Sequence, residues 1–133
     1  MSDRRISLTL FLLRLSVFLV MLVWSLDKFI QPEHAAAVFK TFYFIGGLND
    51  TVIYIIGAVQ LAIVVGFLLG WRKRITYGLV FLFHAVSTLS AFSKYLAPYQ
   101  DVNLLFFAAW PMLAACFALY TLRDLDTLFA IDR

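Results

Sequence analysis

The sequence is poor in cysteine, and this limits the chemistry that the chain can perform. Its 133 residues include one cysteine, Cys116. Disulfide exchange, structural disulfides and thiolate metal cages each need at least two thiols. We therefore do not expect redox chemistry through protein sulfur or a cysteine-based metal centre.

Charged residues are also scarce. Asp, Glu, Lys and Arg make up 14% of the chain and hydrophobic residues 63%, against roughly 25% and 45–50% in ordinary soluble domains. A chain of this length has too little interior to bury so much apolar surface. The small net charge of +3 and the position of the basic residues beside apolar segments favour anionic lipid headgroups, and not nucleic acid, as partners. We predict a single integral membrane domain, 1–133, in contact with the lipid bilayer.

Four apolar stretches are long enough to cross a hydrocarbon core of about 30 Å, which needs roughly 17–25 helical residues. They are residues 6–26, 51–69, 75–92 and 102–120. The short link 70–74 makes the second and third stretches antiparallel neighbours. After the first stretch, Pro32 can begin a short helix that lies along the membrane surface. The predicted fold is all-α, a four-helix membrane bundle with one interfacial helix.

The basic residues predict the orientation, because short loops rich in Lys and Arg stay in the cytoplasm. One side of the predicted bundle has Arg4, Arg5, Arg72, Lys73, Arg74, Arg123 and Arg133, and the other has only Lys28, Lys40 and Lys94. Both termini and the 70–74 turn are therefore predicted to be cytoplasmic.

Small residues recur every four positions in the second stretch. They are Ala58, Ala62, Gly66 and Gly70. This spacing places them on one helix face, where small side chains let another helix approach closely. We interpret this face as a helix-packing surface, and a permeation groove is the functional alternative.

Arg14 is the residue that most needs an explanation. Counted from Ile6 at 1.5 Å per residue, it lies about 12 Å into the hydrocarbon, where a charge costs at least ~2.5 kcal/mol. No Asp or Glu lies inside any of the four stretches. We therefore expect Arg14 to meet neutral acceptors, water or a bound electronegative group.

Other polar residues are predicted to share this level. Gln60 and His84 each lie about 14 Å from the cytoplasmic end of their stretch, and Trp110-Pro111 predicts a kink at a similar level. Arg14 also shares one narrow helix sector with Ser7, Met21, Ser25 and Lys28. The candidate ligand-binding residues are Arg14, Lys28, Gln60, His84 and Trp110.

Two interpretations of this group remain open. In the first, a quinone carbonyl, a lipid phosphate or a small anion binds between the helices. In the second, Arg14 extends to the cytoplasmic surface, and Gln60, His84 and Thr88 only hydrogen-bond between helices. No residue is assigned a catalytic role.

No metal or haem site is predicted. The external face has Asp27, Glu33, His34, Asp50 and Asp101, but no pair shows a recognised ligand spacing. His34 and His84 are expected at different depths, so they are poorly placed to share one haem.

The order of features resembles the DoxX family of small bacterial inner-membrane proteins over most of the chain. Leu12-Leu13-Arg14-Leu15 and Trp24-Ser25-Leu26-Asp27-Lys28-Phe29 resemble the family's early arginine and its Gly-x-x-Lys-Leu pattern, and 56–70 resembles its second helix. Ser25 replaces a usual glycine, Phe29 a leucine and Gln60 a frequent glutamate. The resemblance implies a multi-pass protein of the bacterial inner membrane.

Three functional hypotheses follow. The first is an accessory subunit of a larger, redox-linked membrane complex, with a quinone or lipid pocket near Arg14, Gln60 and His84. This hypothesis implies other membrane subunits as partners. The second is an independent quinone-dependent oxidoreductase, which needs a bound cofactor because no side chain here cycles electrons alone. The third is a small protein that moves lipid or neutral solutes.

Overall fold

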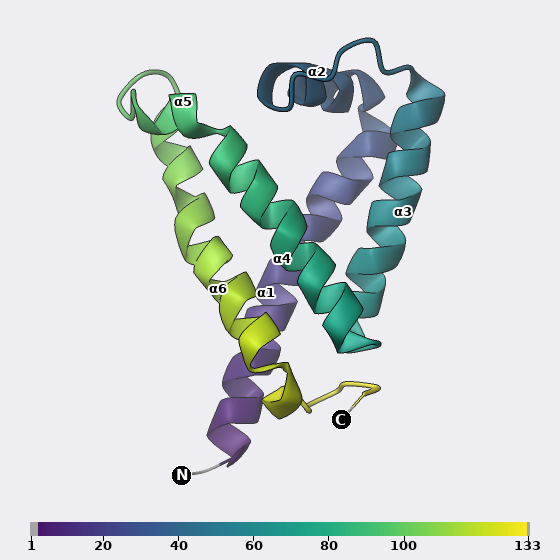
Figure 1. The fold of residues 1–133 in the computed structure, drawn as a ribbon, viewed down its shortest axis with the longest axis vertical. Coiled ribbons are helices and arrows are strands. Elements are labelled where there is room, and N and C mark those ends of the chain that lie inside the picture. Colours follow the sequence, from purple (N-terminus) through teal and green to yellow (C-terminus); the bar gives the residue numbers. More distant parts are fainter. Residues whose placement is uncertain (1–2, 133) are drawn as a thin grey trace.

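The computed structural model describes residues 3–132, and these are helical or in turns, with no strand among them (Figure 1). The elements are α1 (Asp3–Ile30), α2 (Pro32–Phe42), α3 (Asp50–Leu68), α4 (Lys73–Ser90), α5 (Phe92–Tyr95), the 3-10 helix η1 (Asn103–Ala108), α6 (Ala109–Thr121) and the 3-10 turn η2 (Arg123–Leu125). The all-α prediction is confirmed for this part of the chain.

The first helix is longer than the predicted 6–26. α1 has 28 residues, which at 1.5 Å per residue is about 42 Å, more than the roughly 30 Å of a hydrocarbon core. Asp27 and Lys28 do not end it. The helix stops just before Gln31 because Pro32 disfavours helical backbone at the residue that precedes it.

Two helix starts show clear local chemistry. Pro32 is the first residue of α2, as predicted, where its missing N–H costs no hydrogen bond. Asn49 caps α3, and its side-chain oxygen accepts a hydrogen bond of 3.0 Å from the Val52 amide. α3 therefore begins at Asp50, one residue before the predicted stretch.

The fourth stretch is not one regular helix. Residues 103–108 form a 3-10 helix, and α-helical geometry begins at Ala109. Pro111 has no N–H for the carbonyl of Phe107 four residues earlier, so α-helical hydrogen bonding is interrupted there. The sequence predicted a kink at Trp110-Pro111. In the structure, the irregular backbone is the 3-10 segment that precedes these residues.

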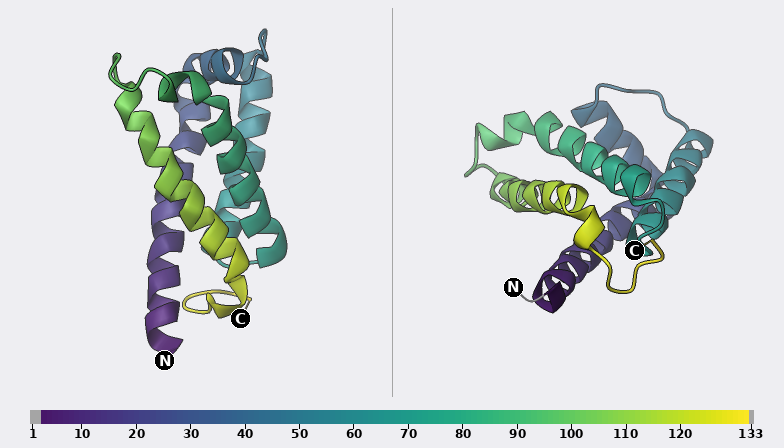
Figure 2. Two further views of the ribbon diagram at one scale, coloured as in Figure 1. Left: turned by 60° about the vertical axis from the view of Figure 1, so that its left-hand side comes forward. Right: turned by 60° about the horizontal axis from the view of Figure 1, so that its bottom comes forward.

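The helices form two antiparallel pairs that diverge. α1 packs along α3, and α4 packs along α6. The pairs converge at the end that holds the α3–α4 turn and both ends of the described chain, and they separate at the end covered by α2 (Figure 1). Two further views show that α2 lies across the open end while the long helices run lengthwise (Figure 2). A shared core from all four long helices includes Val17, Phe67, Val80 and Leu119.

Three helical segments are long and apolar enough to cross a membrane: Arg4–Ile30, Asp50–Leu68 and Asn103–Thr121. Only 22%, 28% and 11% of their most apolar windows are buried within the chain. Leucine, valine and phenylalanine side chains therefore cover much of the outer surface, as expected for helices that contact lipid. α4 is not among the three, because Lys73, Arg74 and His84 lower its hydropathy.

Within the described chain, only half of the predicted small-residue face is buried. Ala58 and Ala62 are exposed, whereas Gly66 and Gly70 are buried. α1 approaches α3 at Gly57 instead, where an added Cβ would lie 3.0 Å from Cβ of Lys28 and 3.1 Å from the Phe29 ring. The buried face of α3 follows Ile53, Gly57, Val64 and Phe67, so the close contact is one residue away from the predicted stripe.

Candidate functional site

Arg14 lies in a polar cluster at the convergent end of the bundle. Its guanidinium is fully buried, and its Nη1 lies 3.0 Å from Oδ1 of Asp126, which is also fully buried. The same nitrogen donates to the Tyr77 hydroxyl at 3.3 Å, and Tyr77 donates to the other Asp126 oxygen at 2.6 Å. Nη2 donates to the Leu128 carbonyl at 2.5 Å. Only Nε lacks a hydrogen-bond partner among the residues described.

Asp126 comes from the segment that follows the last helix. We call residues 126–132 the C-terminal clasp. The amides of Ile131 and Asp132 donate to the carbonyls of Leu69 and Gly70, at 2.8 and 3.0 Å. Lys73 donates to the Asp126 carbonyl. Because these groups include carbonyls left unpaired where α3 ends, the clasp ties the α3–α4 turn to α1.

The expectation that Arg14 lacks an acidic partner is therefore wrong. The count of acidic residues covered only the four apolar stretches, whereas the partner lies beyond them and folds back. Arg14 also does not share a level with Gln60 and His84, because α1 extends past the other helices at the convergent end (Figure 1). Arg14 Nη1 lies 3.5 Å from where a Cβ of Gly70 would be, so the guanidinium is level with the α3–α4 turn.

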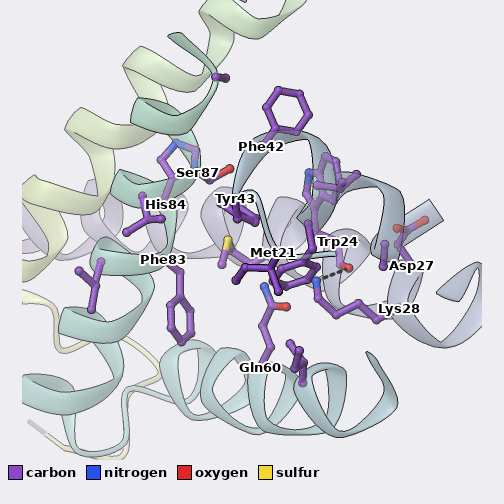
Figure 3. A pocket seen from close by; sticks show the side chains of 18 of the residues that line it. Met21, Trp24, Asp27, Lys28, Phe42, Tyr43, Gln60, Phe83, His84 and Ser87 are labelled. Atoms are coloured by element: carbon purple, nitrogen blue, oxygen red, sulfur yellow. Dashed lines mark hydrogen bonds between the residues drawn. The ribbon is translucent and has the colours of Figure 1, made fainter. Parts of the chain in front are cut away.

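Three of the other four candidate residues lie around an apolar groove at the divergent end. This groove has a volume of about 730 Å³ and lies beneath α2, between α1, α3 and α4. Its lining includes Lys28, Gln60 and His84, but neither Arg14 nor Trp110 (Figure 3). Aromatic and aliphatic side chains form most of the wall: Val20, Met21, Trp24, Val38, Phe39, Phe42, Ile56, Val59, Leu82 and Phe83.

The predicted five-residue site is thus divided. Arg14 belongs to the polar cluster, and Lys28, Gln60 and His84 belong to the groove. Trp110 is partly exposed, and its ring packs against Tyr95 at 5.3 Å between ring centroids. Lys28 and His84 are both buried, but the sequence periodicity did not indicate how the helix pairs diverge.

His84 and Gln60, two of the uncharged polar residues of the groove, differ in their hydrogen bonds. His84 Nε2 lies 2.9 Å from the Ala109 carbonyl. A carbonyl only accepts, so Nε2 carries the hydrogen and the bond joins α4 to α6. The Gln60 amide has no hydrogen-bond partner among residues 3–132. Thr88 donates to the His84 carbonyl within its own helix. Of the interhelical hydrogen bonds predicted for Gln60, His84 and Thr88, the structure therefore has the one from His84.

The external charged residues do not form a metal site. His34 Nδ1 donates to the Asp27 carboxylate at 2.7 Å, and the His34 ring stacks on Trp24. In the described part of the chain, no three His, Cys, Asp or Glu side chains are grouped so that they could hold a metal ion. This pair instead ties α2 to the end of α1.

The fold and the groove define a class of protein: a helical membrane protein with an apolar cleft beneath an end-covering helix. The chain matches no protein-family model, no curated protein and no solved structure. The resemblance to the DoxX family therefore rests on the sequence features described above.

Proposed function

We propose that this chain is a four-span protein of the bacterial cytoplasmic membrane, similar to the DoxX family, that holds a lipophilic ligand in the groove. Its role is that of an accessory subunit in a larger, redox-linked membrane complex. The observation that carries the proposal is the groove itself. Its volume lies in the roughly 300–1,000 Å³ range of small-molecule sites, and a mostly apolar wall with few polar groups is typical of such sites.

The position of α4 supports a fourth crossing. α3 ends at the convergent end and η1 begins at the divergent end, so α4 has to carry the chain back along the bundle (Figure 1). The convergent end carries most of the basic residues, which favours a cytoplasmic location for this end and for both termini.

This topology predicts a labelling pattern. We expect Phe44→Cys and Tyr99→Cys, each made in a Cys116→Ala background, to react with a membrane-impermeant maleimide in intact spheroplasts. Trp71→Cys should react only after lysis, because it lies at the opposite end. All three positions are exposed. If Tyr99→Cys and Trp71→Cys reacted alike, α4 would not cross the membrane.

The resemblance supplies the ligand classes, a quinone or a lipid, and the subunit role. The exposed stripe at Ala58 and Ala62 supports a partner helix, because small side chains facing outward allow close approach. The groove is lined by residues of both α3 and α4, and no other helix lies between these two at the divergent end (Figure 1). We therefore expect a ligand to enter between α3 and α4 from the lipid.

Native mass spectrometry of protein extracted in mild detergent tests both parts. We expect a bound lipophilic molecule and partner membrane proteins in the spectrum. Ser87→Trp places a large side chain in the groove and should remove most of the bound molecule. Leu89→Trp is the matched control on the same helix, because Leu89 is 62% exposed and does not line the groove.

The result that would contradict the proposal is equally defined. A wild-type spectrum without any bound lipophile or partner would remove it. Equal ligand occupancy in Ser87→Trp and Leu89→Trp would show that the bound molecule sits elsewhere on the lipid-facing surface.

A further inference from the structure

The Lys28 ammonium is buried with few polar contacts. Lys28 is 7% exposed. Its Nζ makes one hydrogen bond, to the Trp24 carbonyl of its own helix, at the long distance of 3.4 Å. The Phe39 ring lies 6.0 Å away, a weak cation–π contact. Burying an ammonium with so little compensation is unfavourable.

The neighbouring Asp27 carboxylate attracts this charge only from beyond ion-pair distance. Asp27 precedes Lys28 on α1, and consecutive residues on a helix do not face each other. The Asp27 carboxylate instead accepts the hydrogen bond from His34. Among residues 3–132, Lys28 forms no ion pair.

The helices around Lys28 direct its head group into the groove. Gly57 of α3 packs against the Lys28 stem. The approach is so close that a Cβ added to Gly57 would lie 3.0 Å from Cβ of Lys28. Phe39 of α2 covers the other side. In Figure 3 the Lys28 nitrogen points into the same space as the Gln60 amide. Gln60 is three residues after Gly57, so both lie on one face of α3.

The charge of the lining selects the charge of a ligand. Among residues 3–132, Lys28 is the only lysine or arginine that lines the groove, and Asp27, the only acidic residue of the lining, already accepts a hydrogen bond from His34. A ligand that satisfies this wall therefore has one negative charge beside a long apolar part. A neutral head group would leave the ammonium without a counter-ion.

We propose that the groove binds a single-chain amphiphile with a carboxylate head, of the long-chain fatty acid class. The carboxylate binds Lys28 Nζ, Gln60 donates from its amide, and the hydrocarbon chain lies along the apolar wall. This inference rests on the proposed function, since it names the ligand class of the same groove. The cation that binds the ligand is thus the ammonium of Lys28. The guanidinium of Arg14 is already paired with the Asp126 carboxylate.

The test compares head groups on one chain. Oleate and oleyl alcohol are titrated into the purified protein in nanodiscs of phosphatidylcholine, and bound ligand is measured by native mass spectrometry. We expect oleate to bind more tightly than oleyl alcohol. Lys28→Met should weaken oleate binding by about 10- to 100-fold, the range for loss of a charge-assisted hydrogen bond, and leave oleyl alcohol unchanged. Lys28→Arg should retain the preference for oleate.

Controls separate binding from folding. Lys40→Met removes an exposed lysine of α2 and should bind oleate like the wild type. Protection of the buried thiol of Cys116 from maleimide shows that each variant is folded. A third arm with phosphatidylglycerol distinguishes a phospholipid head group from a free carboxylate.

Three outcomes would overturn the inference. Equal binding of oleate and oleyl alcohol, with no effect of Lys28→Met, would remove the carboxylate while the groove remains a lipophile site. Tighter, Lys28-dependent binding of phosphatidylglycerol would assign the anion to a phosphodiester. Binding of neither oleate nor oleyl alcohol, with no other lipophile in the groove, would remove the proposed function as well.

Discussion

Replacing Arg14 with methionine is expected to lower the free energy of unfolding by about 3–5 kcal/mol, the usual cost of removing one partner of a buried ion pair. The change leaves the buried Asp126 carboxylate with the Tyr77 hydroxyl alone, and it frees the carbonyl of Leu128. The measurement is maleimide labelling of Cys116 in detergent micelles with increasing dodecyl sulfate. Cys116 is the only thiol of the chain and 2% exposed, so its labelling reports unfolding.

A double variant separates the ion pair from the loss of packing. Arg14→Met combined with Asp126→Leu removes both charges, and apolar replacements of a whole buried pair are often neutral or stabilising. We expect the double variant to recover much of the lost stability. Arg5→Met, at an exposed position of the same helix, should label like the wild type. If Arg14→Met also did so, the cluster would contribute nothing to the fold.

Gly70→Ala is expected to release the C-terminal clasp. Gly70 has a φ of +64°, and an added Cβ would lie 2.6 Å from Cβ and 3.1 Å from Cα of Ala130. Left-handed backbone costs a residue with a Cβ roughly 1–2 kcal/mol, and the clash adds to this because backbone must move. We expect faster hydrogen–deuterium exchange at the Ile131 and Asp132 amides, and earlier labelling of Cys116 in dodecyl sulfate.

Gly47→Ala isolates the backbone contribution. Gly47 has a φ of +74°, but nothing lies within 4 Å of its added Cβ. It therefore carries a similar conformational cost without the clash, and it lies at the other end of the bundle from the clasp. Equal exchange at Ile131 and Asp132 in Gly47→Ala and Gly70→Ala would show that the Ala130 contact does not hold the clasp.

Under the proposed function, the two ends of the bundle serve different purposes. At the convergent end, Arg14, Tyr77 and Asp126 join α1, α4 and the clasp through buried charge-assisted hydrogen bonds, which are among the stronger kind. At the divergent end the pairs separate, and α2 closes a space that the long helices leave unfilled. Variants of the cluster should therefore affect unfolding first, and variants of the groove should affect ligand occupancy.

The helices were predictable because their signals are local. Apolar length, the Asn49 cap and Pro32 each act within a few residues of the structure they determine. The buried sector of α1 was also predictable, since Arg14, Met21, Ser25 and Lys28 share one side at about 100° per residue and all are buried. For α3, the small residue at the contact with α1 is Gly57, one position before the predicted stripe at Ala58.

The site needed information that no local pattern holds. Counting 1.5 Å per residue from the cytoplasmic end of each stretch put Arg14, Gln60 and His84 at one level. This count assumed that the helices end together, but α1 begins well beyond the helices it packs against. The acidic partner of Arg14 is 112 residues away in sequence and outside every apolar stretch. Nothing in its immediate neighbourhood, Leu125 to Thr127, marks Asp126 as a buried residue.

The sequence by itself determined that the chain is helical, that its outer surface is apolar, and that helical structure starts anew at Pro32 and is irregular before Pro111. Only the tertiary structure decided that the Arg14 charge is answered by Asp126 and that Lys28 is the cation facing open space. The physical reason is that hydropathy and capping act along one helix, whereas the pairing of charges depends on how far each helix slides past its neighbours. That offset is set by packing at contacts such as Gly57 against Lys28 and Gly70 against Ala130.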